Sequence, residues 1–259
     1  MRSFRGVTYN IHGLPWSKNQ SPAIVRYILS VRPEILCLQE VFTTKLRTFF
    51  TSELTRYGYT VVSPRDEGVT LLGSGLLIAF VSSRFRLLSE SFYPFTAYHS
   101  IEIGANKGFQ TVRLLEEDGS RFLVVNTHTQ SDTAFSFFSS GARRAQFAEM
   151  VRWLEMDRDP ALLMGDMNCE HSPHPHIRFL QNGLARKSTF PRTGEDLDHI
   201  AWIPTQWVPS GMRWCQFDRK GIHAIAYRVD PVPWSDHFPV VADLVIEKRS
   251  TEEGECDGP

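Results

Sequence analysis

Ala161-Leu162-Leu163-Met164-Gly165-Asp166-Met167-Asn168 is the stretch of this sequence around which the other motifs are arranged. A short apolar run ends in a glycine and then presents Asp166 and Asn168. Their side chains lie on the same face of an extended backbone, because side chains alternate along a strand. A carboxylate beside a carboxamide can bind a hard cation, orient a water molecule and donate a hydrogen bond to an anionic oxygen. The same pattern also suits an ordinary Asx turn, so its meaning depends on the partners that other segments supply.

The composition describes an ordinary globular protein of 259 residues, with 42% hydrophobic and 22% charged residues. A chain of this length can bury about three quarters of its unfolded surface, which is enough for one large domain. We expect a single domain over residues 1–247. Residues 248–259 are charged, contain glycine and lack apolar periodicity, so we expect them to form a disordered tail.

The net charge is close to zero, since 28 lysines and arginines face 29 aspartates and glutamates. This balance counts against a dedicated nucleic-acid binder, which usually has a basic surface. The four cysteines are widely spaced and form no CxxC pair, so free thiols in a reducing compartment are expected. There is no signal-peptide pattern and no run of about 18 apolar residues. We therefore expect an intracellular, cytoplasmic protein without a transmembrane segment.

Helical and extended patterns alternate along the chain. Helical spacing recurs over 21–31, 46–57 and 143–156, with Ser21 as the expected N-cap of the first helix, and a short helix is expected near 177–181. Strands are expected over 4–11, 34–38, 59–62, 75–81, 86–92, 109–115, 122–125, 161–168, 197–203 and 239–246, with a hairpin over 214–227. This order predicts an α/β fold, a four-layered α/β sandwich in which two mixed β-sheets pack face to face with helices outside.

Polar side chains stand at the ends of most of these strands. Because a sheet can gather strand ends at one rim, a shared site is more probable there than a set of separate turns. Taken alone, each residue has an ordinary structural explanation, and a lone histidine is more often a hydrogen-bonded core residue than a catalyst. The residues concerned are Asn10, Glu40, Asn126, His128, Asp166, Asn168, Asp198, Asp236 and His237.

This set of side chains suits the hydrolysis of a phosphate ester. Glu40 supplies the oxygen ligand that Mg²⁺ prefers. Asp236 can orient the imidazole of His237, and Asp166 can polarise an attacking water molecule. Donors to the phosphoryl oxygens, as negative charge builds up, would be Asn10, His128 and Asn168.

The local histidine cluster His171-Ser172-Pro173-His174-Pro175-His176 leaves a zinc site open as an alternative. Cys169 is the nearby candidate for a fourth ligand. The two prolines disrupt helical ligand spacing, so a surface loop is the preferred interpretation.

Six motifs occur in an order typical of one known superfamily. They are Thr8-Tyr9-Asn10-Ile11, Leu38-Gln39-Glu40-Val41, Asn126-Thr127-His128, Gly165-Asp166-Met167-Asn168, Leu197-Asp198-His199-Ile200 and Ser235-Asp236-His237. Through these motifs the chain resembles the endonuclease/exonuclease/phosphatase superfamily, with its deoxyribonuclease-I-like fold, from Thr8 to Val245. Within that superfamily it looks most like the neutral sphingomyelinases, through 38–42, 106–109 and 127–132.

The resemblance implies a metal-dependent phosphodiester hydrolase, with Mg²⁺ as the expected ion and Mn²⁺ as the alternative. The implied metal ligands are Glu40, Asn10, Asp166 and Asp236. The implied catalytic residues are Asp166, His237, His128, Asn168 and Asp236. The implied substrate ligands are Asn10, Asn126, Lys107 and Asp198.

Two departures from the superfamily pattern stand out. His199 replaces the usual tyrosine after Asp198, which could change how this strand end contacts the phosphate. The aromatic membrane-inserting hairpin of secreted bacterial sphingomyelinases is replaced by a turn at Asp218-Arg219-Lys220-Gly221.

The expected partner is a phospholipid at a membrane surface, with sphingomyelin as the best candidate, and the chain is expected to be a monomer. The alternatives are a nucleic acid, a nucleotide or an inositol phosphate, and a binding module without catalysis is a third hypothesis. Phe135, Phe137 and Phe138 could meet a lipid surface or pack under the following helix. Four tryptophans could stack bases or fill the core: Trp202, Trp207, Trp214 and Trp234.

Overall fold

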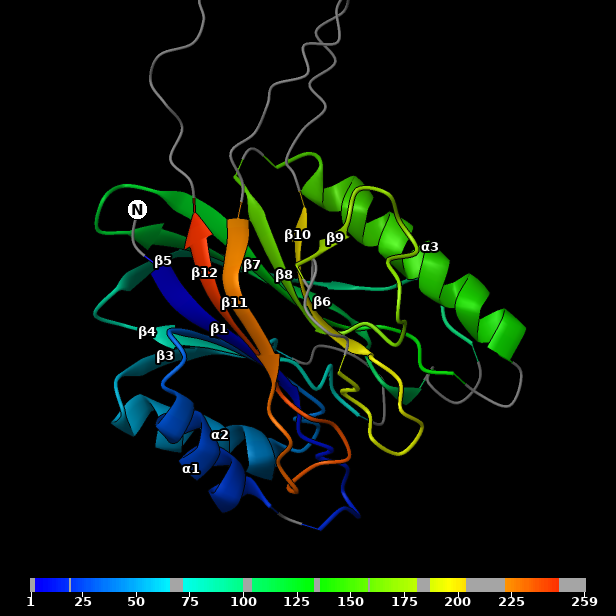
Figure 1. Ribbon diagram of the computed structural model, residues 1–259, viewed down its shortest axis with the longest axis horizontal. Coiled ribbons are helices and arrows are strands. Elements are labelled where there is room, and N and C mark those ends of the chain that lie inside the picture. Colours follow the sequence, from blue (N-terminus) through cyan, green and yellow to red (C-terminus); the bar gives the residue numbers. More distant parts are fainter. Residues whose placement is uncertain are drawn as a thin grey trace, which may run out of the picture.

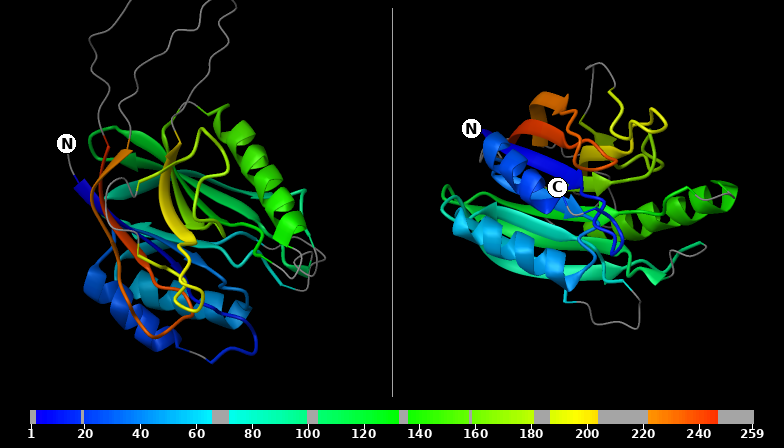
Figure 2. Two further views of the ribbon diagram at one scale, coloured as in Figure 1. Left: turned by 45° about the vertical axis from the view of Figure 1, so that its right-hand side comes forward. Right: turned by 90° about the horizontal axis from the view of Figure 1, so that it is seen from below.

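The structure is a computed structural model that describes residues 3–18, 20–65, 72–99, 104–132, 136–157, 159–180, 187–203 and 222–246. Within these ranges, two six-stranded sheets pack face to face with helices on the outer surfaces (Figures 1 and 2). This arrangement confirms the expected four-layered α/β sandwich. The expected tail over 248–259, the turn at 218–221 and two of the tryptophans, Trp207 and Trp214, lie outside the described residues.

The strand order of both sheets is now defined. The first sheet has the order β11-β12-β1-β2-β4-β3, with β1 (Ser3–Asn10), β2 (Ile35–Gln39), β3 (Tyr59–Val62), β4 (Leu77–Val81), β11 (Ile222–Val229) and β12 (Val240–Ile246). The second sheet has the order β5-β6-β7-β8-β10-β9, with β5 (Phe85–Pro94), β6 (Gly108–Glu116), β7 (Arg121–His128), β8 (Ala161–Asp166), β9 (Arg178–Phe179) and β10 (Asp198–Ile203).

Each sheet has one parallel pair of strands at its centre. β1 pairs with β2 in the first sheet and β7 pairs with β8 in the second, while the other pairings are antiparallel. A parallel connection must cross the sheet, and a helix makes each crossing. α1 (Ser21–Val31) connects β1 to β2, and α3 (Ser136–Leu154) connects β7 to β8. The third helix, α2 (Thr44–Arg56), lies beside α1 on the first sheet.

Side-chain alternation in the central strands explains why both faces of each sheet are buried. Even-numbered residues of β1, β7 and β8 point between the sheets, where Phe4, Phe122 and Met164 belong to one hydrophobic cluster. Odd-numbered residues point outward to the helices. Val7 and Tyr9 belong to a cluster that includes residues of α1 and α2. The corresponding outer cluster of the second sheet packs against α3 and contains Leu123, Val125, Leu163, Phe147 and Met150.

The helix ends differ from the sequence expectation in two places. Gln20, rather than Ser21, occupies the N-cap position of α1, and its side chain makes no capping hydrogen bond. α3 begins at Ser136, a full two turns before the expected start at 143. No helix in the described ranges is long and apolar enough to cross a membrane.

The expected short helix near 177–181 is wrong. Residues Arg178 and Phe179 instead form β9 and pair with β10. The stacked rings of Phe179 and His199, with centroids 3.8 Å apart, explain this choice, because a strand places the phenylalanine flat against its neighbour. Trp202 in β10 is partly buried against the core between the sheets, and Trp234 packs with the outer cluster, so these two tryptophans are core residues.

Gly165 is the position in β8 where a side chain is least tolerable. A Cβ atom there would lie 2.1 Å from the backbone oxygen of Thr127 in the neighbouring strand. Because the obstacle is backbone, the two central strands of the sheet would have to separate. The glycine of the Gly-Asp-x-Asn stretch is therefore required by the close approach of β7 and β8.

We expect Gly165→Ala to lower the free energy of unfolding by about 3 kcal/mol, at the upper end of the cost of overpacking. Gly141→Ala in α3 is the matched control, since its Cβ would meet nothing within 4 Å. This control should be neutral or stabilising by up to about 1 kcal/mol, because alanine favours the helix. Urea denaturation of both variants measures the difference, and equal stabilities would contradict this account of Gly165.

Candidate active site

The inner faces of the central strands change from apolar to polar at one end of the sandwich. Along β7 the inward side chains run from Phe122 and Val124 to Asn126 and His128, and along β8 they end at Asp166. β10 runs antiparallel to β8 and places Asp198 opposite Asp166. The carboxyl ends of the parallel pairs therefore bring buried polar groups together between the sheets, as in other open α/β sites.

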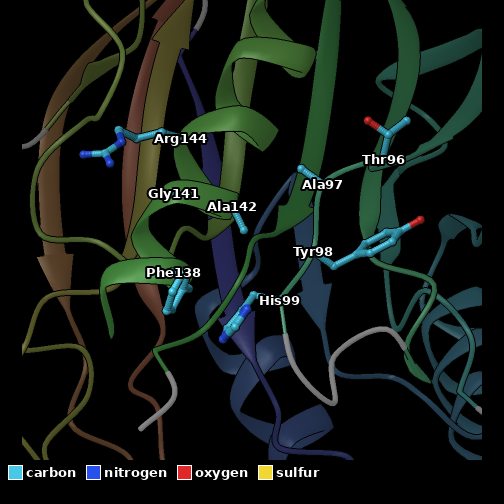
Figure 3. A pocket seen from close by; sticks show the side chains of 8 residues that line it. All are labelled: Thr96, Ala97, Tyr98, His99, Phe138, Gly141, Ala142 and Arg144. Atoms are coloured by element: carbon cyan, nitrogen blue, oxygen red, sulfur yellow. The ribbon is translucent and has the colours of Figure 1, made fainter. Parts of the chain in front are cut away.

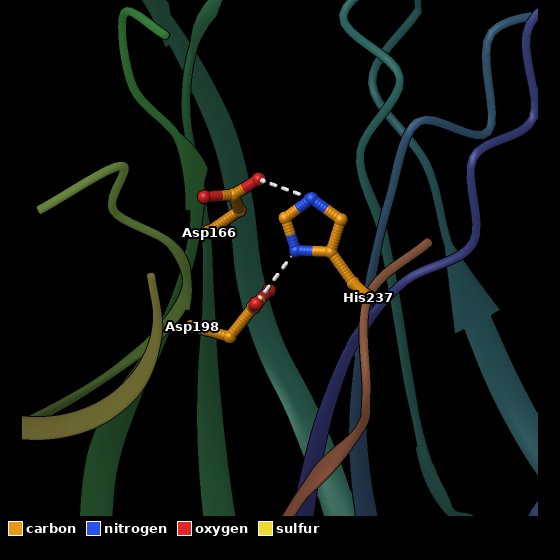
Figure 4. Close-up of side chains that lie close together, drawn as sticks. All are labelled: Asp166, Asp198 and His237. Atoms are coloured by element: carbon orange, nitrogen blue, oxygen red, sulfur yellow. Dashed lines mark hydrogen bonds and ion pairs between the residues drawn. The ribbon is translucent and has the colours of Figure 1, made fainter. Parts of the chain in front are cut away.

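Asp166, Asp198 and His237 form a row of charged groups at this end (Figure 4). The Nδ1 atom of His237 lies 2.7 Å from Oδ2 of Asp198, and its Nε2 atom lies 3.8 Å from Oδ2 of Asp166. Backbone contacts hold the histidine in place. Its amide donates to Ser235 Oγ at 3.2 Å, and Ser235 Oγ donates to the carbonyl oxygen of Asn10 at 2.7 Å. The segment before β12 is thus tied to the end of β1.

The two carboxylates keep His237 charged. Burial opposes the charge, but Asp198 and Asp166 outweigh it and raise the pKa of His237 to about 10. Burial also opposes ionisation of Asp166, yet His237, His128 and the hydrogen bond from Asn10 lower the pKa of its carboxyl group. Burial raises the pKa of Asp198 to about 6. At neutral pH the row is an imidazolium between two carboxylates.

His128 has the opposite protonation state. Burial and the neighbouring Lys107 lower the pKa of His128 to about 3, so its imidazole is neutral. Lys107 Nζ lies 3.3 Å from His128 Nε2 and donates to the carbonyl oxygen of Thr129 at 2.8 Å. The Nδ2 atom of Asn168 donates to the same carbonyl oxygen at 3.1 Å. Lys107, His128 and Asn168 therefore form one donor-rich wall of the site.

Asn10 links the acidic groups of the two sheets. Its Nδ2 atom donates to Glu40 Oε1 at 3.0 Å and to Asp166 Oδ2 at 2.9 Å, while its Oδ1 atom accepts from the amide of His12 at 3.0 Å. Both amide hydrogens are thus used within the protein, and the residue is fully buried. The expectation that Asn10 donates to a phosphoryl oxygen does not fit this geometry. Asn10 positions two carboxylates instead.

Glu40 and Asp236 form the second acidic pair. The Oε2 atom of Glu40 is buried and has no hydrogen-bond partner among the residues that the structure describes. Burial also raises the pKa of the Glu40 carboxyl group. Between the two carboxylates lies His12, whose Nδ1 atom is 3.0 Å from Asp236 Oδ2 and 3.8 Å from Glu40 Oε2. His12 was not among the residues expected from the sequence, although its spacing of two residues from Asn10 and its position before Gly13 could have indicated it.

The backbone is unusual at three of these positions. His12, Glu40 and Asn168 have φ angles of 49°, 60° and 48°, in the left-handed region that non-glycine residues seldom adopt. Such conformations cost energy and are found most often where a site requires them. The residue after His12 must be glycine, because a Cβ atom at Gly13 would lie 2.2 Å from the carbonyl oxygen of Glu40.

Two groups of side chains offer ligands to a divalent cation. Ligand atoms of Asp166, Asp198 and His237 lie within 4.8 Å of one another. The Nδ1 atom of His237 already faces Asp198, however, and a protonated imidazole cannot ligate a metal. The free oxygen of Glu40 fits a hard cation better. A bound cation there would activate water and neutralise phosphoryl charge.

The structure corrects three expected roles. The Asn126 side chain is fully buried; it donates to the carbonyl oxygens of Leu38 and Leu77 and accepts from Gln39 at 2.7 Å, so it joins the sheets and does not reach a substrate. Asp198 is also fully buried, and its carboxylate faces the His237 imidazole instead of an open part of the site. It is Asp198, not Asp236, that orients the His237 imidazole.

The other histidines near the site are structural. The fully buried His199 lies within hydrogen-bond distance of the Cys169 and Asp196 carbonyl oxygens, so it does not contact a phosphate. His176 pairs with Glu155 beyond the end of α3. Among the described residues, the histidine cluster at 171–176 forms no group that could hold a metal, which leaves the surface-loop interpretation.

Known proteins resemble this chain in sequence and in fold. The family described as "Endonuclease/Exonuclease/phosphatase family" matches residues 7–237. Nocturnin of Rattus norvegicus is 26% identical over 190 residues, which cover 70% of this chain and 42% of the relative. The chain thus spans less than half the length of that relative.

Solved structures share the fold at low sequence identity. Staphylococcus aureus beta toxin with bound magnesium ions has a TM-score of 0.72 at 15% identity, covering 93% of this chain and 99% of the toxin. Sphingomyelinase C from Streptomyces griseocarneus has a TM-score of 0.67 at 18% identity, covering 94% and 99%. D. rerio TDP2 with a single-strand DNA product has a TM-score of 0.71 at 11% identity, also covering 94% and 99%.

We expect His237 to remain an imidazolium in metal-free protein well above pH 7. Because its pKa is raised on folding, the resulting stabilisation is complete below about pH 6.5 and is lost as the pH rises toward 10. Asp198→Asn should lower the His237 pKa, since it removes the negative charge that raises this pKa most. Imidazole ¹⁵N chemical shifts in EDTA-treated protein measure this titration. Deprotonation of wild-type His237 near pH 6.5 would contradict the presence of an imidazolium between Asp166 and Asp198. Comparison with His237→Gln isolates the contribution of His237 to the pH dependence of the free energy of unfolding.

Proposed function

We propose that this chain, which belongs to the endonuclease/exonuclease/phosphatase family, is a metal-dependent phosphodiester hydrolase that acts on a phospholipid in the manner of a sphingomyelinase. Members of this family are hydrolases that act on phosphodiester bonds. The observation that carries the proposal is the row of Asp166, His237 and Asp198 placed beside Glu40 by a shared hydrogen-bond donor, Asn10.

Each charged group has a task in an in-line displacement. Asp166 stays ionised and can accept a proton from the attacking water, whose oxygen forms the new bond to phosphorus. The imidazolium of His237, held by Asp198, can give its Nε2 proton to the leaving oxygen as the P–O bond breaks. Lys107, the neutral His128 and Asn168 can donate hydrogen bonds to the phosphoryl oxygens. Glu40 and Asp236 would hold the divalent cation that stabilises the developing charge.

The substrate proposal rests on aromatic side chains around the site. Trp16, in the loop after β1, is 77% exposed, and Tyr98 and Phe138 are 45% and 59% exposed. Tyr98 follows β5, whose end pairs with the start of β6, and β6 in turn pairs with the end of β7. All three aromatics therefore belong to the edge where the site lies. Large exposed aromatics at one rim favour an interface with lipid head groups and acyl chains.

Tyr98 and Phe138 line a shallow hollow beside the start of α3 (Figure 3). The ring of Phe138 stacks on His99 with centroids 5.3 Å apart, and the amide of His99 donates to Gln130 Oε1 at 2.9 Å. Gln130 is two residues after His128, so the hollow adjoins the phosphate donors. A substrate held at the site could extend a bulky group into it.

A nucleic acid is the second candidate, because Arg144 also lines this hollow. A guanidinium beside exposed aromatic rings suits a nucleotide, in which bases stack and phosphates attract cations. TDP2, which shares this fold, has been crystallised with a DNA product. The two candidates differ in their dependence on salt, because polynucleotide binding weakens steeply as the salt concentration rises.

We expect purified protein to release phosphocholine from sphingomyelin vesicles with Mg²⁺, and to lose this activity in EDTA. Glu40→Gln and Asp166→Asn should each lower kcat/KM by about 10²- to 10⁴-fold, since they remove a metal ligand and a proton acceptor. Glu90→Gln, on the exposed part of β5, is the matched control and should keep full activity. Cleavage of DNA or RNA without phosphocholine release would favour the second candidate, and unchanged rates in both variants would indicate a binding module.

The exposed aromatic side chains Trp16, Tyr98 and Phe138 should determine binding to lipid surfaces. We expect Trp16→Ala and Phe138→Ala each to weaken vesicle binding by about tenfold, as each removes roughly 1.5 kcal/mol of buried apolar contact. The same variants should hydrolyse a soluble short-chain substrate at nearly the wild-type rate. Met156→Ala is the control, since Met156 is 73% exposed beyond the opposite end of α3. Vesicle sedimentation measures binding, and equal binding by all variants would contradict a lipid-facing rim.

A further inference from the structure

We propose that His12 is itself a ligand of the divalent cation and gives the site a preference for transition metals over Mg²⁺. The proposal rests on the proposed function only in placing a cation beside Glu40. None of the sequence motifs singles out His12, and the inference comes from its position between Glu40 and Asp236.

The distances around His12 suit ligands of one octahedral ion. Two neighbouring ligands at about 2.1 Å from such an ion lie about 3.0 Å apart, and opposite ligands lie about 4.2 Å apart. The Nδ1 atom of His12 is 3.0 Å from Asp236 Oδ2 and 3.8 Å from Glu40 Oε2. Both separations fall within this range. The three atoms could therefore bind one cation with small side-chain movements.

The backbone holds His12 in this position. Its amide donates to Asn10 Oδ1, and its φ angle of 49° lies in the left-handed region. The next residue, Gly13, passes against the carbonyl oxygen of Glu40, where a Cβ atom could not fit. A histidine held in a strained conformation beside the half-buried Glu40 fits a ligand position, because strain of this kind is found most often at functional sites.

The free oxygen of Glu40 is the second observation that points to an ion. Within the described part of the chain, the Oε2 atom is buried without a hydrogen-bond partner, although Asn10 donates to the other oxygen of the same carboxylate. Leaving a buried carboxylate oxygen unpaired is costly, so a further partner is expected. The side chain of His12 is 41% exposed, so the imidazole has room to turn its Nδ1 atom toward a cation beside Glu40.

A nitrogen ligand changes which metal the site prefers. Oxygen ligands alone suit Mg²⁺, whereas an imidazole ligand increases the affinity for transition metals. Among these, Co²⁺ binds more tightly than Mn²⁺. We therefore expect the protein to bind Mn²⁺ and Co²⁺ more tightly than Mg²⁺. His12→Gln should weaken Mn²⁺ binding by about tenfold or more while changing Mg²⁺ binding by less than about threefold.

Pulsed electron paramagnetic resonance of protein loaded with Mn²⁺ alone tests this directly. A coordinated imidazole adds ¹⁴N modulation to the Mn²⁺ signal. We expect this modulation in the wild type, in His237→Gln and in the surface control His176→Gln, and its loss in His12→Gln. Absence of the modulation in the wild type, or its persistence in His12→Gln, would overturn the proposal. Loss of the modulation in His237→Gln alone would assign the nitrogen to His237 instead.

Two further measurements keep the result interpretable. Thermal unfolding of each variant without metal identifies a folding defect, and His12→Ala repeats the test with a smaller side chain. Failure of the proposed function gives a different pattern. Protein that hydrolyses no phosphodiester but shows ¹⁴N modulation from His12 would retain this metal site, whereas active protein without the modulation would retain the function and lose the His12 ligand.

Discussion

The hydrogen bonds that Asn10 donates to Glu40 and Asp166 are the constraint on which the site depends. The bond to Asp166 is buried and crosses from one sheet to the other, whereas the bond to Glu40 joins the ends of β1 and β2 within the first sheet. Together they hold two carboxylates that would otherwise repel each other. Deeper between the sheets, Gln39 Nε2 donates to Asn126 Oδ1 at 2.7 Å and forms a second polar link. Buried polar groups must find partners, and here the partners are available only when the sheets have the observed spacing. The same network therefore fixes both the sandwich and the geometry of the site.

Two histidines show how strongly position determines chemistry in this site. His128 and His237 are both almost fully buried, yet Lys107 and burial keep the first neutral, whereas two carboxylates keep the second charged. Identical side chains thus become a neutral donor and a cationic acid. Separating the protonation states of similar groups in this way is how acid and base roles are assigned in many hydrolases.

The sequence predicted the layers and the position of the site because alternation and strand ends are local signals. Asp166, His128, Glu40 and His237 meet as expected. The roles of Asn10, Asn126 and Asp198 could not be predicted, since whether a polar side chain faces a substrate or another strand depends on long-range pairing. His12 was missed because its carboxylate neighbours, Glu40 and Asp236, come from segments far from it in the chain. The strand at Arg178–Phe179 was missed because contact with His199 overrides local helical preference.

The pairing of β1 with β12 has a consequence for the order of folding. Ser3 lies opposite Val245 and Thr8 opposite Val240, so β1 takes one of its two neighbours from a strand far along the chain. His237 lies on the segment just before that strand. The second sheet is made of strands between residues 85 and 203, so it can form without β11 and β12, whereas the first sheet and the imidazolium of His237 cannot be in place without this segment. The charged row of the site is therefore among the last parts of the fold to assemble.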